Sequence, residues 1–254
     1  MRIAAVQHDI VWEDRAATLA HLDGQVAAAA AGGARLVAFT EMFATGFSMN
    51  THTTAEAPDG PTVTWLRDQA VRHDVWVAGS VALRVPEHDL AVNALCLVSP
   101  VGEVHRYDKI HPFSYAGEHE RFAAGDRFVT VDVEGVRVTL FVCYDLRFAD
   151  EFWACAVDTD AYLVVANWPD ARRHHWRALL DARAIENQAY VVGVNRVGDG
   201  GGLHYTGDSR IVHPLGEVLA SGAGGETTLF ADLDPMVVAD VRARLPFLPD
   251  RRSH

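Results

Sequence analysis

The chain has 254 residues, 49% of them apolar, which suffices for the core of one large α/β domain. Its 22 Lys and Arg residues stand against 34 Asp and Glu residues, and the net charge of −12 argues against binding to nucleic acids or anionic membrane surfaces. We expect no signal peptide, because MRIAAVQHDIVW alternates apolar and polar residues, and no apolar run is long enough to span a bilayer. The cysteines, Cys96, Cys143 and Cys155, form no CxxC pair, which argues against disulfides and a thiolate zinc site. These features predict a cytoplasmic protein with reduced thiols.

Strand-like and helix-like segments alternate along the whole sequence. Predicted strands cover residues 3–8, 35–39, 75–83, 92–98, 103–107, 127–133, 136–142, 163–166, 190–195, 209–213, 217–220 and 228–233. Predicted helices cover residues 14–31, 61–74, 172–187 and 234–244, and we expect loops at 111–126 and at the glycine cluster 198–202. Because no linker or repeat interrupts this alternation, we predict one α/β domain over residues 1–254, with helices outside mixed sheets.

Three of the apolar strands lead to a reactive side chain. LVAFTEMF leads to Glu41, VHRYDKIHPF to Lys109 and VTLFVCYDLRF to Cys143. A rigid sheet aims the side chains at its strand ends into a cleft, so these positions are typical of catalytic groups. Each residue alone has a simpler explanation, since a lone cysteine after a strand usually packs in the core and a lone Glu or Lys usually faces water. The chemistry of the set favours the catalytic interpretation.

A thiol, a carboxylate and an ammonium group can together attack a carbonyl. The thiol of Cys143 is mostly protonated at neutral pH, because the reference pKa of cysteine is about 8.5. It becomes a good nucleophile when Glu41 takes its proton and the charge of Lys109 favours the thiolate. Lys109 and the backbone N–H of Tyr144 can then hold the oxyanion that forms on the substrate.

The same segments resemble the nitrilase superfamily of carbon–nitrogen hydrolases, whose catalytic residues are Glu, Lys and Cys in this order. FTEMFATGFS, YDKIH and CYDLRF match its three motifs, and the likeness extends over nearly the whole chain. A second family Glu precedes a Gly in the loop after the Lys. Here AGEHERFAAG offers Glu118 and Glu120, and the spacing to Gly125 favours Glu118, in a role of orienting the Lys and the substrate. Thr40 and Pro112 depart from the residues common in the family, which puts the local loop shape in doubt.

The resemblance implies a four-layer α/β/β/α sandwich that associates through its helical faces as a homodimer or a larger homo-oligomer. We expect the helix at 172–187 and the C-terminal segment at that interface. It also implies an amidase that works through a Cys143 thioester and needs no metal or organic cofactor. The histidines agree with this, since they show no HExxH or comparable metal-binding spacing. His111 is expected to be structural, and Asp145 to cap or pair locally.

Within the superfamily, CYDLRFAD and the stretch NWPDARRHHWRALLDARAIENQAY are most similar to the ω-amidases, which hydrolyse the terminal amide of α-keto acids such as 2-oxoglutaramate. Such substrates carry an anionic end, for which Arg147 and Arg172 are candidate ligands. The alternative for Arg147 is an ion pair with a nearby Asp. Asn167 and Trp168, directly after a predicted strand, are further candidates for substrate binding.

Two kinds of alternative stay open. The chain could be another amidase of the superfamily (an aliphatic or deaminated-glutathione amidase), a nitrilase, a carbamoylase or an acyltransferase. A non-catalytic binding module on the same fold is the second alternative, which the presence of Glu41, Lys109 and Cys143 disfavours.

Overall fold

The computed structural model describes residues 1–252, so the last two residues of the predicted domain, 253–254, lie outside it. The described residues form two sheets of seven strands each. The first sheet runs in the order β14 (Thr227–Asp232), β1 (Arg2–Gln7), β2 (Leu36–Ala38), β3 (Trp76–Leu83), β4 (Ala91–Val98) and β5 (Val104–Asp108), with β6 (Phe122–Ala123) paired to β4. The second runs in the order β11 (Val197–Gly200), β12 (Leu203–Val212), β10 (Tyr190–Asn195), β9 (Ala161–Ala166), β8 (Val136–Val142) and β7 (Thr130–Val133), with β13 (Val218–Ala223) paired to β12.

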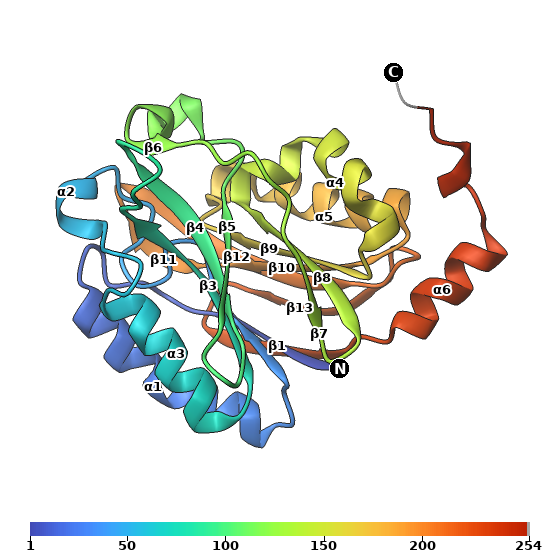
Figure 1. The fold of residues 1–254 in the computed structure, drawn as a ribbon, viewed down its shortest axis with the longest axis horizontal. Coiled ribbons are helices and arrows are strands. Elements are labelled where there is room, and N and C mark those ends of the chain that lie inside the picture. The colour runs from blue at the N-terminus through green and yellow to red at the C-terminus, as the bar shows by residue number, and fades with distance from the viewer. Residues whose placement is uncertain (253–254) are drawn as a thin grey trace.

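The two sheets pack face to face through a buried apolar core to which both contribute, for example Leu95 and Tyr107 from the first sheet and Leu140 and Leu163 from the second. Helices cover the outer faces: α1 (Arg15–Ala31) and α3 (Pro61–His73) lie on the first sheet, α4 (Ala149–Cys155) and α5 (Arg173–Asn187) on the second (Figure 1). The architecture is the predicted four-layer α/β/β/α sandwich. The helix α6 (Pro235–Arg244) extends away from the sheets (Figure 1).

The remaining helical elements are short. They comprise α2 (Thr51–Thr54) and the 3-10 turns Ser114–Ala116, Glu118–Glu120, Cys143–Arg147, Ala156–Asp158, Asp170–Arg172 and Leu248–Asp250.

Local sequence explains where the helices begin and which face they bury. The side chain of Asp14 caps α1 by accepting a 2.9 Å hydrogen bond from the N–H of Ala17. Pro61 occupies the first turn of α3, where its missing N–H costs no hydrogen bond. Val63, Leu66 and other residues at helical spacing then bury the inner face of α3 against the sheet.

Several elements differ from the sequence prediction. The strand β6 lies in the predicted loop 111–126, and α2 was not predicted, because both are too short to show a periodicity. The glycine cluster 198–202, predicted as a loop, belongs to the hairpin of β11 and β12, because Gly201 and Gly202 take positive φ angles of 58° and 78° and turn the chain tightly. The ring of Trp12 packs on this hairpin, and a Cβ at Gly200 would lie only 2.8 Å from it. The helix α4 was not predicted, since its seven residues make fewer than two turns and show too little periodicity.

No helix formed by residues 1–252 is long and apolar enough to cross a membrane.

Candidate active site

Side chains from strand ends of both sheets meet at one place. Glu41 lies three residues after β2, and Lys109 directly follows β5, both in the first sheet. Cys143 directly follows β8, and Asn167 directly follows β9, both in the second. The three residues predicted as the catalytic set are therefore brought together by the packing of the two sheets.

Lys109 is buried between two carboxylates. Its Nζ donates to Oε1 of Glu41 at 2.9 Å and to Oε2 of Glu118 at 2.8 Å. The side chain of Lys109 is 1% exposed, and those of Glu41 and Glu118 are 0% exposed. Burial lowers the pKa of Lys109, but the charges of Glu118 and Glu41 outweigh it and raise that pKa well above its usual value. The ammonium group is therefore permanently charged at neutral pH.

Of the two glutamates left open by the sequence, Glu118 faces Lys109 and Glu120 is exposed. The N–H of Phe113 also donates to Oε2 of Glu118, which closes the loop around the carboxylate. Gly125, the glycine of this motif, cannot be replaced by a residue with a side chain without a clash. A Cβ there would lie 2.1 Å from the carbonyl oxygen of Asp108.

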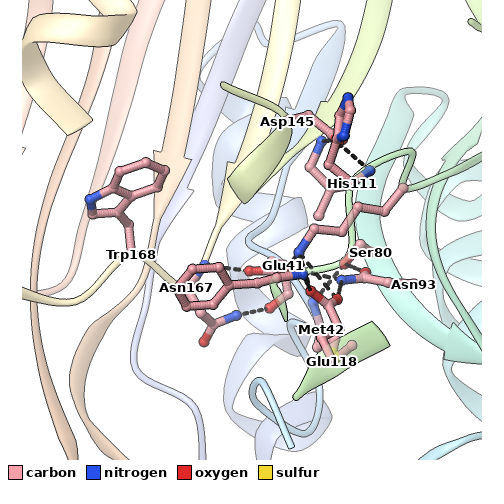
Figure 2. Close-up of polar contacts among 12 residues, drawn as sticks. Glu41, Met42, Ser80, Asn93, His111, Glu118, Asp145, Asn167 and Trp168 are labelled. Atoms are coloured by element: carbon pink, nitrogen blue, oxygen red, sulfur yellow. Dashed lines mark hydrogen bonds and ion pairs between the residues drawn. The ribbon is translucent and has the colours of Figure 1, made fainter. Parts of the chain in front are cut away.

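Asn93, in the middle of β4, was not identified from the sequence. Its Nδ2 donates to Oε1 of Glu41 at 2.9 Å and to Oε1 of Glu118 at 3.0 Å, so that one amide bridges both carboxylates (Figure 2). Ser80 donates to Oδ1 of Asn93 at 2.9 Å, which fixes the amide with its NH₂ group toward the carboxylates. The residue lies in a continuous apolar stretch, AVNALCLV, and a buried polar residue in such a strand was the one available signal.

Cys143 begins the 3-10 turn after β8 with a positive φ of 47°. This conformation is strained for a residue other than glycine, and it turns the side chain away from the sheet. Cys143 is partly exposed, whereas Cys96 and Cys155 are buried. Burial around the sulfur and the charge of Glu41 raise the pKa of the Cys143 thiol well above its usual value, against the opposing charge of Lys109. The resting sulfur is therefore a thiol.

Glu41 is held from the second sheet by Asn167. The N–H of Asn167 donates to Oε2 of Glu41 at 2.8 Å, and its side-chain Nδ2 donates to the carbonyl oxygen of Glu41 (Figure 2). The side-chain Oδ1 of Asn167 is buried and has no hydrogen-bond partner among the described residues. Asn167 thus positions the carboxylate of Glu41, and the residue also lines the pocket.

A pocket opens above Cys143, and all of the predicted substrate-binding residues line it. Tyr144, Arg147, Asn167, Trp168 and Arg172 lie on its wall. Phe47, from the motif that contains Glu41, lies there too. Further lining residues come from segments far apart in the chain that the sequence did not single out: Trp12, Phe113, Leu203 and Tyr205.

The two pocket arginines are held by aromatic rings. The guanidinium carbon of Arg147 lies 4.8 Å from the centroid of the Trp168 ring, and that of Arg172 lies 5.5 Å from the centroid of the Phe113 ring. In the part of the chain that the structure describes, neither forms an ion pair with a carboxylate, whereas the adjacent Arg173 pairs with Asp208 at 2.8 Å. The predicted alternative of an Arg147–Asp pair is therefore absent from residues 1–252.

Across residues 1–252, no group of three or more His, Cys, Asp or Glu side chains is arranged to hold a metal ion.

The family model for carbon–nitrogen hydrolases matches residues 2–243. The chain belongs to the carbon–nitrogen hydrolase family. It is 42% identical to the omega-amidase YafV of Escherichia coli K12, over 98% of this chain and 96% of that protein. It is also 32% identical to the 2-oxoglutaramate amidase of Bacillus subtilis, over 87% of this chain and 86% of that protein.

Solved structures agree with this assignment. The fold superposes on XC1258 from Xanthomonas campestris, a CN-hydrolase superfamily protein, with a TM-score of 0.95 and 38% identity, over 100% of this chain and 98% of that chain. An amidase from Nesterenkonia sp. AN1 superposes with a TM-score of 0.84 and 28% identity, over 97% and 98% of the two chains, and carries acrylamide added at its active-site cysteine. The predicted family and fold are confirmed, and the protein is a carbon–nitrogen hydrolase that acts on amides.

Asn93 offers a direct test of the carboxylate cluster. Asn93→Leu keeps the branched shape of the side chain but removes the NH₂ group that bridges Glu41 and Glu118. A hydrogen bond to a charged group is worth about 1.5–3 kcal/mol, so we expect kcat/KM for amide hydrolysis to fall about 10- to 100-fold. Asn93→Asp should cost more, because it adds a third carboxylate beside the other two. Equal activity of the wild type and both variants would contradict the role of the bridge, and Asn50→Ala, at an exposed position, serves as the control.

Proposed function

We propose that the protein is an ω-amidase that hydrolyses the terminal carboxamide of a small α-keto acid such as 2-oxoglutaramate. The observation that carries the proposal is a thiol, Cys143, beside the Glu41–Lys109–Glu118 cluster at the base of a pocket that also holds two arginines. The names of the relatives, omega-amidase and 2-oxoglutaramate amidase, support the substrate class.

The reaction begins when Sγ of Cys143 attacks the carbonyl carbon of the carboxamide and Glu41 accepts the thiol proton. This coupling follows from the raised pKa of Cys143, because a free thiolate is scarce in the resting site. The charge of Lys109 and the N–H of Tyr144 stabilise the oxyanion on the former carbonyl oxygen. Glu41 then delivers the proton to the amide nitrogen, and the C–N bond breaks. Ammonia departs, and the acyl group remains bound to Cys143 as a thioester.

Water completes the cycle. Glu41 takes a proton from a water molecule as that molecule attacks the thioester carbon, the C–S bond breaks, and the carboxylic acid product leaves. The proton on Glu41 returns to the sulfur of Cys143. Glu118 acts through Lys109, whose ammonium group it keeps charged and oriented.

The far end of the substrate carries a carboxylate, and Arg147 and Arg172 are the proposed ligands for it. A guanidinium group matches a carboxylate with two parallel hydrogen bonds, and these two lack a competing acidic partner within residues 1–252. Asn167 lines the same pocket and is a further proposed contact of the carboxamide.

We propose in addition that residues 1–254 act as one domain and that the protein works in the cytoplasm. We also propose that it forms a homodimer or a larger homo-oligomer. Large apolar side chains are exposed on the helical face of the second sheet and after α6: Trp153 is 41%, Ile185 50% and Phe247 43% exposed. An exposed group of this kind favours association between copies of the chain.

The nucleophile is tested by Cys143→Ala, which should lower the rate of ammonia release from 2-oxoglutaramate by at least about 10³-fold, because the acyl-enzyme cannot form. Mass spectrometry of the wild type should detect an acyl adduct on Cys143, and Cys96→Ala and Cys155→Ala should retain activity.

The substrate is tested by a panel of 2-oxoglutaramate, glutamine, succinamate, aliphatic amides, nitriles and ureido acids. Among these we expect 2-oxoglutaramate to have the highest kcat/KM. A nitrile or ureido acid in first place would overturn the proposed substrate.

The carboxylate ligands are tested by Arg147→Gln and Arg172→Gln. Loss of a charge-assisted hydrogen bond of about 1.5–3 kcal/mol should raise KM for 2-oxoglutaramate about 10- to 100-fold, while hydrolysis of a neutral aliphatic amide changes little. Arg177→Gln, at an exposed position of α5, is the matched control. If both pocket variants kept the wild-type preference for the anionic amide, these arginines would not bind its carboxylate.

The oligomeric state is tested by sedimentation velocity, which should report a dimer or a larger species at micromolar concentration. Ile185→Glu places a charge on the exposed apolar face and should shift the equilibrium toward monomer. A wild-type monomer would contradict the proposed association.

A further inference from the structure

Asp145, two residues after Cys143, has a fully buried carboxylate that accepts three hydrogen bonds. Its Oδ2 accepts from the hydroxyl of Tyr107 at 2.8 Å and from the N–H of Val142 at 3.0 Å. Its Oδ1 accepts from the N–H of His111 at 2.9 Å (Figure 2). Burial raises the pKa of Asp145 to about 6, in spite of the nearby charge of Lys109 and these hydrogen bonds. Burying a charged carboxylate costs free energy, so we ask what this one contributes to the site.

The three donors lie next to Lys109 and Cys143 along the chain. Tyr107 and His111 lie two residues before and two residues after Lys109, and Val142 immediately precedes Cys143. Asp145 therefore holds the backbone on both sides of Lys109 against the turn that carries the nucleophile.

This contact also joins the two sheets. Tyr107 belongs to β5 of the first sheet, and Val142 ends β8 of the second. Tyr107 is 0% exposed, and the centroid of its ring lies 5.8 Å from that of the Phe141 ring between the sheets. This packing holds the Tyr107 hydroxyl in place as a donor to Asp145. Lys109 and Cys143, which come from different sheets, are thus tied to each other through one carboxylate.

We propose that Asp145 is a positioning residue that sets the separation of Lys109 and Cys143 in the transition state. The inference rests on the proposed function only in that both residues take part in amide hydrolysis. Asp145 itself touches neither the substrate nor the reacting atoms. Its effect is on the alignment of the ammonium group with the oxyanion that forms at the Cys143 adduct.

The chemistry of the three donors explains why an amide is a poor replacement. The backbone N–H groups of His111 and Val142 can only donate, and they approach different oxygens of Asp145. Whichever way an asparagine is turned, its NH₂ group faces one of these N–H groups. Asp145→Asn therefore keeps the shape of the side chain but breaks at least one of the contacts that hold the two segments together.

The test measures kcat and KM of Asp145→Asn for the best amide substrate, together with alkylation of Cys143 by iodoacetamide. Alkylation consumes the thiol without forming an oxyanion, and a folded chain protects the buried Cys96 and Cys155. Chains modified at Cys143 alone therefore count the correctly folded sites independently of the alignment of Lys109. We expect kcat per alkylatable Cys143 to fall on the order of 10²-fold, with KM within about 3-fold of wild type. Tyr107→Phe removes one of the three hydrogen bonds and should lower kcat per alkylatable Cys143 several-fold. Asp150→Asn, at an exposed position of α4, should leave this value unchanged.

The proposal is overturned if kcat per alkylatable Cys143 stays within about 3-fold of wild type in Asp145→Asn. If that variant does not fold, Tyr107→Phe decides: a several-fold loss of kcat per alkylatable site supports the positioning role, and an unchanged value rejects it. A failure of the proposed function is seen separately, because the wild type would then hydrolyse none of the amides although its Cys143 is alkylated.

Discussion

The site depends on one ammonium group, that of Lys109, buried between the carboxylates of Glu41 and Glu118. Two carboxylates and one ammonium leave an excess negative charge on side chains that are at most 1% exposed, and hydrogen-bond donors stabilise it there. The NH₂ group of Asn93 bridges both carboxylates, and the backbone of Asn167 donates to Glu41. Each of these donors is held by the fold, so the charge arrangement exists before a substrate arrives.

The same negative charge determines how the nucleophile works. Because burial and Glu41 raise the pKa of Cys143, the resting sulfur is a thiol, and in the proposed mechanism its proton passes to Glu41 as the sulfur attacks. This sequence differs from that of a cysteine activated by a neighbouring cation alone, where the thiolate is formed in advance. Here the positive charge of Lys109 is shared with two carboxylates, and its stabilising effect falls mainly on the oxyanion.

The reacting groups come from both sheets, so the packing of the sandwich sets their distances. Asn167 of the second sheet holds Glu41 of the first, and Asp145 joins the segment around Lys109 to the nucleophile turn. A small shift of one sheet on the other would change the distances from Cys143 and Asn167 to Glu41 and Lys109. The apolar core between the sheets therefore sets the geometry of the proposed site as well as contributing stability.

The sequence by itself determined the family, the α/β/β/α class and most strands and helices, because strand periodicity and motif chemistry are local properties of the chain. For the same reason it singled out Glu41, Lys109 and Cys143 as the candidate catalytic set. It favoured Glu118 over Glu120 through the spacing to a glycine that has no room for a side chain. Only the tertiary structure decided which buried polar groups complete the site. Asn93 contacts Glu41, which is 52 residues away and follows a strand two places along the same sheet. Asp145 contacts Tyr107, which is 38 residues away and belongs to the other sheet. Contacts of this kind depend on register and packing, and no local pattern reports them.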